Sequence, residues 1–477
     1  MTVLSASERF VESVGPIVVK EVRQGLRAKV FAIFFGSLLV VCLSMALVAV
    51  AQATEAAGTA FGKDFFGGYL TALGAVTFFV IPFVAFRSMV RELEDETWVL
   101  LTLTGLGANS IVRGKWVSAM SQALLFGSAC APFVLFSYFL NGIDIVQVVT
   151  ALVLATGWSA LLTSIGVAVA TQAQSKLGRT IAHFVVLGLL GLGTMAGIAF
   201  AWVIAEEGHR LVTNDAFRNF AIGAGVFSWG LTWLMLESAA AGLALPSEAA
   251  SRGPRIAYVI VGLLGLAFGL AVFLLEKGRP KDAVAGQVIT SFFFTIAGAF
   301  CVSEADGWPR QAATGSWLKP GAARSFWLAV VMLFLSALMW GLLIGDYTVS
   351  NDGNADGRAF RGTMAAFAFP TLYLSLGVLM GRLTPLRHLS EPVATRVGFI
   401  LSVVVGVVAS MALSLVFEGS ARGREMNALN PLVGLFNFID RSGSELNSAI
   451  VLLGAVTLMA VFLAAVVLHA RDEVRSS

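Results

Sequence analysis

The chain has 477 residues, of which 57% are hydrophobic and only 13% are charged, so an ordinary soluble domain is excluded. The net charge of +3, with basic residues spread over many loops, argues against nucleic-acid binding. Apolar stretches of about 20 residues recur along the chain, and this is the length that crosses a bilayer as a helix. The stretches are continuously apolar rather than alternating, which excludes a transmembrane barrel.

Residues 1–29 precede the first apolar stretch and are expected to form a cytoplasmic N-terminus with an amphipathic helix. Pro16 suits the first position of that helix. The helix would then have two stripes. The apolar stripe consists of Val18, Val22 and Leu26, and the polar, mainly basic stripe consists of Lys20, Gln24 and Arg27. This pattern is typical of a helix lying in the membrane interface.

The sequence predicts an all-α polytopic bundle of twelve spans in two six-helix units, residues 30–245 and 246–477. The predicted spans are Val30–Ala51, Gly67–Met89, Trp116–Phe139, Val146–Thr171, Thr180–Ala205, Phe220–Leu236, Ile256–Leu275, Val284–Ser303, Phe326–Tyr347, Met364–Gly381, Val397–Phe417 and Ser448–His469. With both termini cytoplasmic, inner segments hold 21 of the 32 Lys and Arg residues and outer segments hold 11. The positive-inside rule therefore favours this orientation. Whether the two units are a true duplication is left open.

The inner loop Ser88–Trp116 is acidic, although a segment against the cytoplasmic membrane face normally favours Lys and Arg. Read as a helix, it places apolar residues and threonines on one stripe: Val90, Leu93, Thr97, Leu100, Leu101 and Thr104. Glu92, Asp95 and Glu96 lie roughly opposite and would form an acidic face for a basic groove on a soluble partner. The alternative is an ordinary helix whose acidic residues favour the N-terminal end of its dipole.

Two stretches resemble a known family. Arg91-Glu92-Leu93-Glu94, Thr97–Gly105 and Gly114-Lys115 resemble the loop after the second helix of type-2 ABC transporter permeases, with Glu96 at a usual glycine and Gly105 at a usual proline. The run Gly15–Arg27 resembles the entry sequence of the same family, with Gly15 at a usual asparagine. In that family the loop is a coupling helix that docks on a separate ATPase, and the entry forms an elbow helix beside it.

The resemblance implies two sets of functional residues. The ATPase-coupling set is Arg91, Glu92, Glu94, Asp95, Glu96, Thr97, Gly114 and Lys115. The elbow-helix set is Pro16, Lys20, Glu21, Arg23, Gln24 and Arg27.

The last outer loop contains a segment, residues 426–440, that resembles the outer re-entrant helices of the same family. Five apolar residues of Asn427–Phe436 could return to the membrane surface: Leu429, Leu432, Val433, Leu435 and Phe436. A loop that packs on itself explains them equally well.

Sequence motifs for chemistry are absent. There is no GxxxxGK[ST] phosphate-binding loop, the four histidines are far apart, and Cys42, Cys130 and Cys301 lie in apolar runs as small core residues. We therefore expect neither enzyme activity nor a cofactor in this chain, with ATP hydrolysis on a separate partner.

The sequence as a whole indicates a permease subunit of an ABC-type transporter in the bacterial inner membrane, moving its substrate outwards. The expected partners are an ABC-type ATPase and membrane lipids. Whether a second permease or a second copy of this chain completes the transporter is left open. Two alternatives also remain: a secondary transporter that works without an ATPase, and a membrane-embedded assembly or maturation factor.

Overall fold

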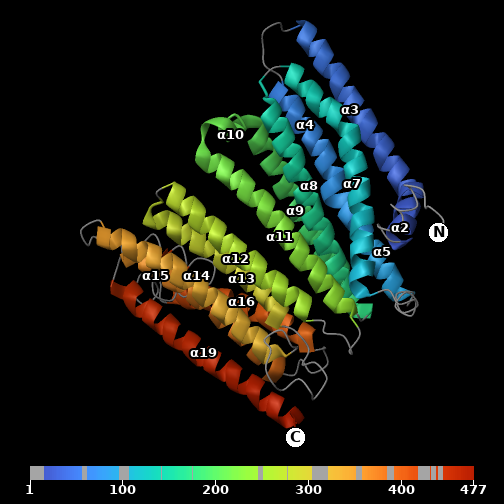
Figure 1. Ribbon diagram of the computed structural model, residues 1–477. Coiled ribbons are helices and arrows are strands. Elements are labelled where there is room, and N and C mark those ends of the chain that lie inside the picture. Colours follow the sequence, from blue (N-terminus) through green and yellow to red (C-terminus); the bar gives the residue numbers. More distant parts are fainter. Residues whose placement is uncertain are drawn as a thin grey trace, which may run out of the picture. The chain divides into compact units, whose positions relative to one another are not determined.

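The computed structural model describes residues 16–55, 62–95, 107–140, 142–173, 176–244, 251–276, 278–302, 321–350, 357–383, 391–416, 430, 434, 437–438 and 444–476. Within these residues every regular element is a helix and no strand is present (Figure 1). The chain divides into two compact units, Met1–Leu245 and Pro246–Ser477. This division falls at the predicted boundary between the two six-helix units.

The first unit contains a short helix followed by six spans. Its elements are α2 (Pro16–Arg27), α3 (Lys29–Glu55), α4 (Gly62–Gly74), η1 (Ala75–Val80), α5 (Ile81–Glu94), α7 (Ala108–Phe139), α8 (Ile145–Gln172), α9 (Lys176–Glu207), α10 (Arg210–Thr213) and α11 (Asp215–Leu243). α4, η1 and α5 follow one another without a break and form one span. η1 is a π-helical turn that ends two residues before Pro82, a residue without an amide N–H to donate.

The second unit contains six long helices: α12 (Arg252–Leu275), α13 (Pro280–Val302), α14 (Ala322–Ser350), α15 (Gly357–Leu383), α16 (Glu391–Val416) and α19 (Ser444–Ser476). Across both units, twelve helices of the described chain are long and apolar enough to cross a membrane. Each overlaps one of the twelve predicted spans, so the prediction of a twelve-span helical bundle is confirmed.

The predicted span ends are less accurate than the spans themselves. The predicted inner loop Ser88–Trp116 is largely helical in its described part, because α5 continues to Glu94 and α7 begins at Ala108. The predicted limits follow the fall in hydropathy, but Arg and Glu are good helix formers and extend a helix beyond its apolar part. Residues 96–106, which include Thr97 and most of the expected apolar stripe, lie outside the described residues.

α8 is the central helix of the first unit and packs against α5, α7, α9 and α11. At Gly166, α8 lies directly against the backbone of α5, and an added Cβ would lie 2.9 Å from the carbonyl oxygen of Pro82. Side-chain hydrogen bonds join α8 to its neighbours: Ser159 donates to the carbonyl of Thr77 over 2.9 Å, and Trp116 donates to that of Ala160 over 3.1 Å. Small and weakly polar residues thus hold this bundle together, as expected in a bilayer.

The same pairs of spans pack together in both units when the spans are numbered one to six. The fourth span, α8 or α15, contacts the second, third, fifth and sixth spans of its own unit. The first span, α3 or α12, contacts the second and third. The two units therefore share one scheme of helix packing, as an internal duplication would give.

The described residues of segment 426–440 are all buried in the second unit. Phe438 is fully buried, with its ring centroid 6.5 Å from that of Phe369 in α15. Asn430 is buried beside α16, where its Nδ2 donates to the carbonyl of Val407 over 3.5 Å. These residues pack on the helices, whereas the five apolar residues that suggested a return to the membrane lie outside the described residues.

The three cysteines are buried and free, as predicted for small core residues. Cys42 of α3 and Cys130 of α7 place their Sγ atoms 3.7 Å apart.

Candidate functional site at the inner end of the first unit

The predicted elbow helix is present as α2, which begins at Pro16 and ends at Arg27 before a bend at Ala28. Lys20, Arg23, Gln24 and Arg27 are exposed, and they line an open hollow of about 700 Å³ along α2. α2 packs on α7, where Gly25 lies so close to Gln122 that an added Cβ would collide with the amide. α2, the end of α5 and the start of α7 thus meet, and we call this region the inner end, because the basic-residue count predicts that it faces the cytoplasm.

Lys115, on the second turn of α7, is the centre of a polar network at the inner end. Its side chain is 4% exposed. The Nζ atom lies 2.7 Å from Glu92 Oε1 and 3.4 Å from Glu21 Oε2, and it donates to Ser88 Oγ over 2.9 Å. An ammonium group has three donors, so this geometry gives each one an acceptor.

The network joins three separate stretches of the sequence. Glu21 comes from α2, Ser88 and Glu92 lie one helical turn apart on α5, and Lys115 comes from α7. The two carboxylates are also shielded, with side-chain exposures of 13% for Glu21 and 18% for Glu92. Because removal of one partner from a buried pair leaves an uncompensated charge, loss of one of these charged side chains would destabilise the packing of the three helices.

Two further ion pairs connect the inner end to other spans. Arg113 of α7 lies 2.7 Å from Glu237 of α11, and the Glu237 side chain is only 9% exposed. Arg179 of α9 lies 3.6 Å from Glu94 of α5, where the carboxylate is 52% exposed. Each pair has one half-exposed partner, and the second pair is the weaker of the two because its charged atoms are farther apart.

The predicted coupling residues fall into three groups. Glu92, Gly114 and Lys115 are turned into the protein, whereas Arg91, Glu94 and Asp95 are exposed at the C-terminal end of α5. Glu96 and Thr97 lie outside the described residues. The expected exposed acidic face is therefore corrected in one member, because Glu92 faces Lys115 and is not displayed with Asp95.

The elbow-helix residues divide in a similar way. Glu21 faces Lys115, and the four polar residues that line the hollow face away from the bundle. Of the expected apolar stripe, Val18 and Val22 are half-buried and Leu26 is 36% exposed.

Sequence reasoning missed Ser88 as a member of the Lys115 network, and it missed Arg179 and Glu237 as members of the two further ion pairs. Ser88 and Glu92 are four residues apart, which places them on one helix face, so this signal was present in the sequence. Glu237 and Arg179 are near span ends, but their partners come from helices that only the fold brings together. In the described chain, no group of three or more His, Cys, Asp or Glu residues could hold a metal ion.

Comparison with family models, curated proteins and solved structures found no match to this chain. The class that the fold defines is a multi-pass helical membrane protein with twelve spans.

Proposed function

We propose that this chain is the permease subunit of an ATP-driven transporter of the type-2 ABC kind, located in the cell membrane. Its ATPase is a separate chain that docks at the inner end of the first unit. ATP binding and hydrolysis on that partner move the helices, and the transported substrate leaves the cell.

One observation carries the proposal: the three motifs that resemble the permease family supply the three charged members of one buried network. Glu21 belongs to the elbow-helix motif, Glu92 to the opening of the coupling loop and Lys115 to its Gly-Lys end. A force applied to either the elbow helix or the loop would reach α7 through this contact. Mechanical connection of this kind is what a coupling element needs.

The position of the buried charges favours energy supplied by a partner over ion-coupled transport. In the described spans, four charged side chains are buried: Lys115, Glu237, Arg255 and Arg382. Each lies within eight residues of an end of its helix, and each of those ends is predicted to be cytoplasmic. A proton- or sodium-coupled carrier would instead need ionisable groups near mid-membrane.

The contact of Glu92 with Lys115 restricts the docking surface that we propose. The acidic contact is assigned to Asp95, which is exposed, and to Glu96. A basic groove is the complementary surface for these acidic residues.

The proposal is tested by reversing the exposed acids while leaving Glu92 intact. In Asp95→Lys/Glu96→Lys we expect at least a tenfold loss of bound ATPase, because like charges at an interface cost several kcal/mol. The matched control is Asp215→Lys, which reverses a carboxylate that is 76% exposed at the predicted outer end. The measurement is the amount of ATPase that co-purifies and its stimulated ATP hydrolysis. Equal binding by both variants would contradict this docking surface.

A further inference from the structure

A polar cavity lies at the opposite end of the first unit, away from the Lys115 network. Its volume is about 610 Å³, within the range of about 300–1,000 Å³ that is common for small-molecule sites. It lies where the start of α4, the end of α7, the start of α8 and the corner between α9 and α10 meet, and we call it the outer cavity. Its main lining residues are Lys63, Tyr138, Phe139, Asp144, Gln147 and His209.

Buried hydrogen bonds fix the floor of the outer cavity. Gln147 is 2% exposed; its Nε2 donates to the carbonyl of Ile204 over 3.2 Å, and its Oε1 accepts from the amide of Asp144 over 2.7 Å. Asp144 caps α8 in return. Gly208 packs so closely on Gln147 that no Cβ would fit. The floor is therefore already ordered before a ligand binds, which lowers the entropic cost of binding.

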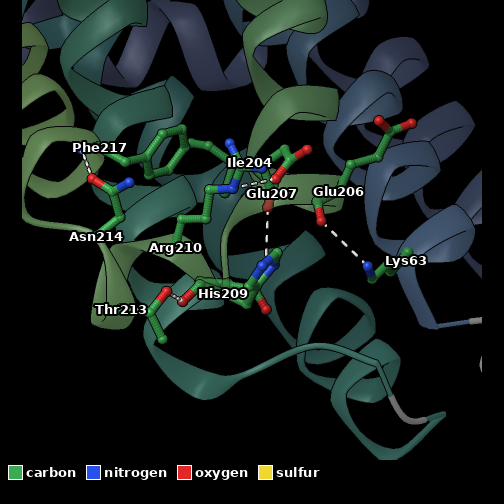
Figure 2. A network of polar contacts seen from close by, with 10 residues as sticks. Lys63, Ile204, Glu206, Glu207, His209, Arg210, Thr213, Asn214 and Phe217 are labelled. Atoms are coloured by element: carbon green, nitrogen blue, oxygen red, sulfur yellow. Dashed lines mark hydrogen bonds and ion pairs between the residues drawn. The ribbon is translucent and has the colours of Figure 1, made fainter.

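Lys63 supplies a cationic group with unused donors. Its Nζ donates to the carbonyl of Glu206 over 3.2 Å, and the two side chains lie at the edge of the network in Figure 2. An ammonium group has three donors, so within the part of the chain that the structure describes two of them remain for a ligand. His209, also shown in Figure 2, adds an exposed imidazole beside it.

Four neighbouring charged residues form two ion pairs and do not line the outer cavity. Glu207 lies 2.7 Å from Arg210, a pair seen in Figure 2, and Asp215 lies 2.6 Å from Arg218. The exposed Asp64 and Glu206, which adjoin Lys63, do not line it either. The charged groups that line the cavity are thus cationic Lys63 and anionic Asp144, with His209 as a titratable neighbour. A ligand with one anionic and one cationic group would complement both.

Two aromatic residues mark this rim as a membrane interface. Tyr138 is 44% exposed and Phe139 is 75% exposed, at the C-terminal end of α7. Tyr is enriched at both surfaces of a bilayer, where its ring is in apolar surroundings and its hydroxyl lies near headgroups, and the apolar ring of Phe139 contacts that of Tyr138. A lipid headgroup would therefore lie beside the outer cavity.

We infer that the outer cavity binds a phosphoethanolamine headgroup. Lys63 and His209 bind the phosphate, Asp144 binds the ammonium, and Tyr138 and Phe139 contact the glycerol end of a lipid in the outer leaflet. This goes beyond the proposed function and does not rest on it, because the site needs no ATPase.

The test is a titration of the full-length protein in detergent, with bound lipid counted by native mass spectrometry. The ligands are phosphatidylethanolamine, phosphatidylglycerol, which has no ammonium group, and free phosphoethanolamine. The variants are Lys63→Met and Asp144→Asn, the second of which keeps the helix cap while removing the charge. The matched control is Arg218→Met, an outer cation that does not line the cavity. A thermal unfolding curve for each variant shows whether it remains folded.

We expect phosphatidylethanolamine to bind more tightly than phosphatidylglycerol, and Lys63→Met to weaken it about tenfold, as for the loss of a charge-assisted hydrogen bond. Asp144→Asn should reduce the preference for phosphatidylethanolamine, and Arg218→Met should change nothing. Tight binding of free phosphoethanolamine would support recognition of this headgroup, and it would show that the ligand comes from solution and not from a lipid. Unchanged binding in both folded cavity variants, or equal binding of the two lipids by the unmodified protein, would overturn the inference.

Discussion

Replacing Lys115 with Met tests whether the inner-end network holds the first unit together. Lys115 Nζ lies 2.7 Å and 3.4 Å from two carboxylates, and its side chain is 4% exposed. Removing the ammonium leaves Glu21 and Glu92 side by side with little solvent. Breaking one side of a buried pair costs about 3–5 kcal/mol, and here the expected cost lies near the lower figure because both carboxylates keep some contact with water.

The matched control is Arg210→Met. Arg210 lies 2.7 Å from Glu207, the same separation as in the Lys115–Glu92 pair, but the two side chains are 51% and 40% exposed. An exposed ion pair such as this one contributes only about 0–1 kcal/mol. Comparing the two variants therefore contrasts a buried network with an exposed pair at the same N–O distance.

The assay is thermal unfolding in detergent, combined with hydrogen exchange in α2. Lys115→Met should unfold at a clearly lower temperature and exchange faster in α2, whereas Arg210→Met should match the unmodified protein. Adding Glu92→Gln to Lys115→Met should restore part of the lost stability, because it removes one of the two unpaired charges. The reasoning is refuted if Lys115→Met is as stable as Arg210→Met and α2 stays equally protected.

Three more predictions concern the membrane bundle. Single cysteines at Thr2 and Ser476, in a background without the native cysteines, should resist impermeant thiol reagents in intact cells, and labelling at either end would contradict the topology. Gly166→Ala should lower the free energy of unfolding by about 1–3 kcal/mol, because the added methyl group meets a backbone carbonyl of α5. Gly127 has open space around it, so Gly127→Ala should not destabilise the protein. Equal melting temperatures of the two variants would refute the close approach at Gly166. Phe438→Ala should cost about 3–5 kcal/mol, since this side chain is fully buried, and no change in unfolding would show that the outer segment does not pack on the second unit.

The sequence predicts the spans well because their signal is local. Twenty apolar residues in a row need no partner to identify them, and Pro16 together with the alternating stripes of α2 indicates the elbow helix in the same way. The ends of the helices are harder to predict. Glu94 and Ala108 lie beyond the apolar stretches, where the hydropathy of the sequence has fallen. Both are nevertheless helical, because Glu and Ala favour the helix even outside an apolar stretch.

The contacts of the inner end could be predicted only in part. All three charged members of the network lie in recognisable motifs, but Glu21 and Lys115 are 94 residues apart and meet only when α2 packs on α7. The prediction that Glu92 is displayed on an exposed acidic face was wrong, since its carboxylate faces Lys115. The repeated packing scheme is invisible in the sequence, because many different apolar residues can fill a surface that faces lipid.

The measurement that tests the central claim most directly is site-specific crosslinking from the exposed end of α5. Asp95→Cys, in the background without native cysteines, would carry a short thiol-reactive photocrosslinker in membranes that contain the native partners. The attached chain would then be identified by sequence and by labelling with an ATP analogue. We expect a nucleotide-binding ATPase at Asp95→Cys and none at Asp215→Cys on the predicted outer end. If the folded protein yields no nucleotide-binding chain from Asp95→Cys, it is not coupled to an ATPase through this loop.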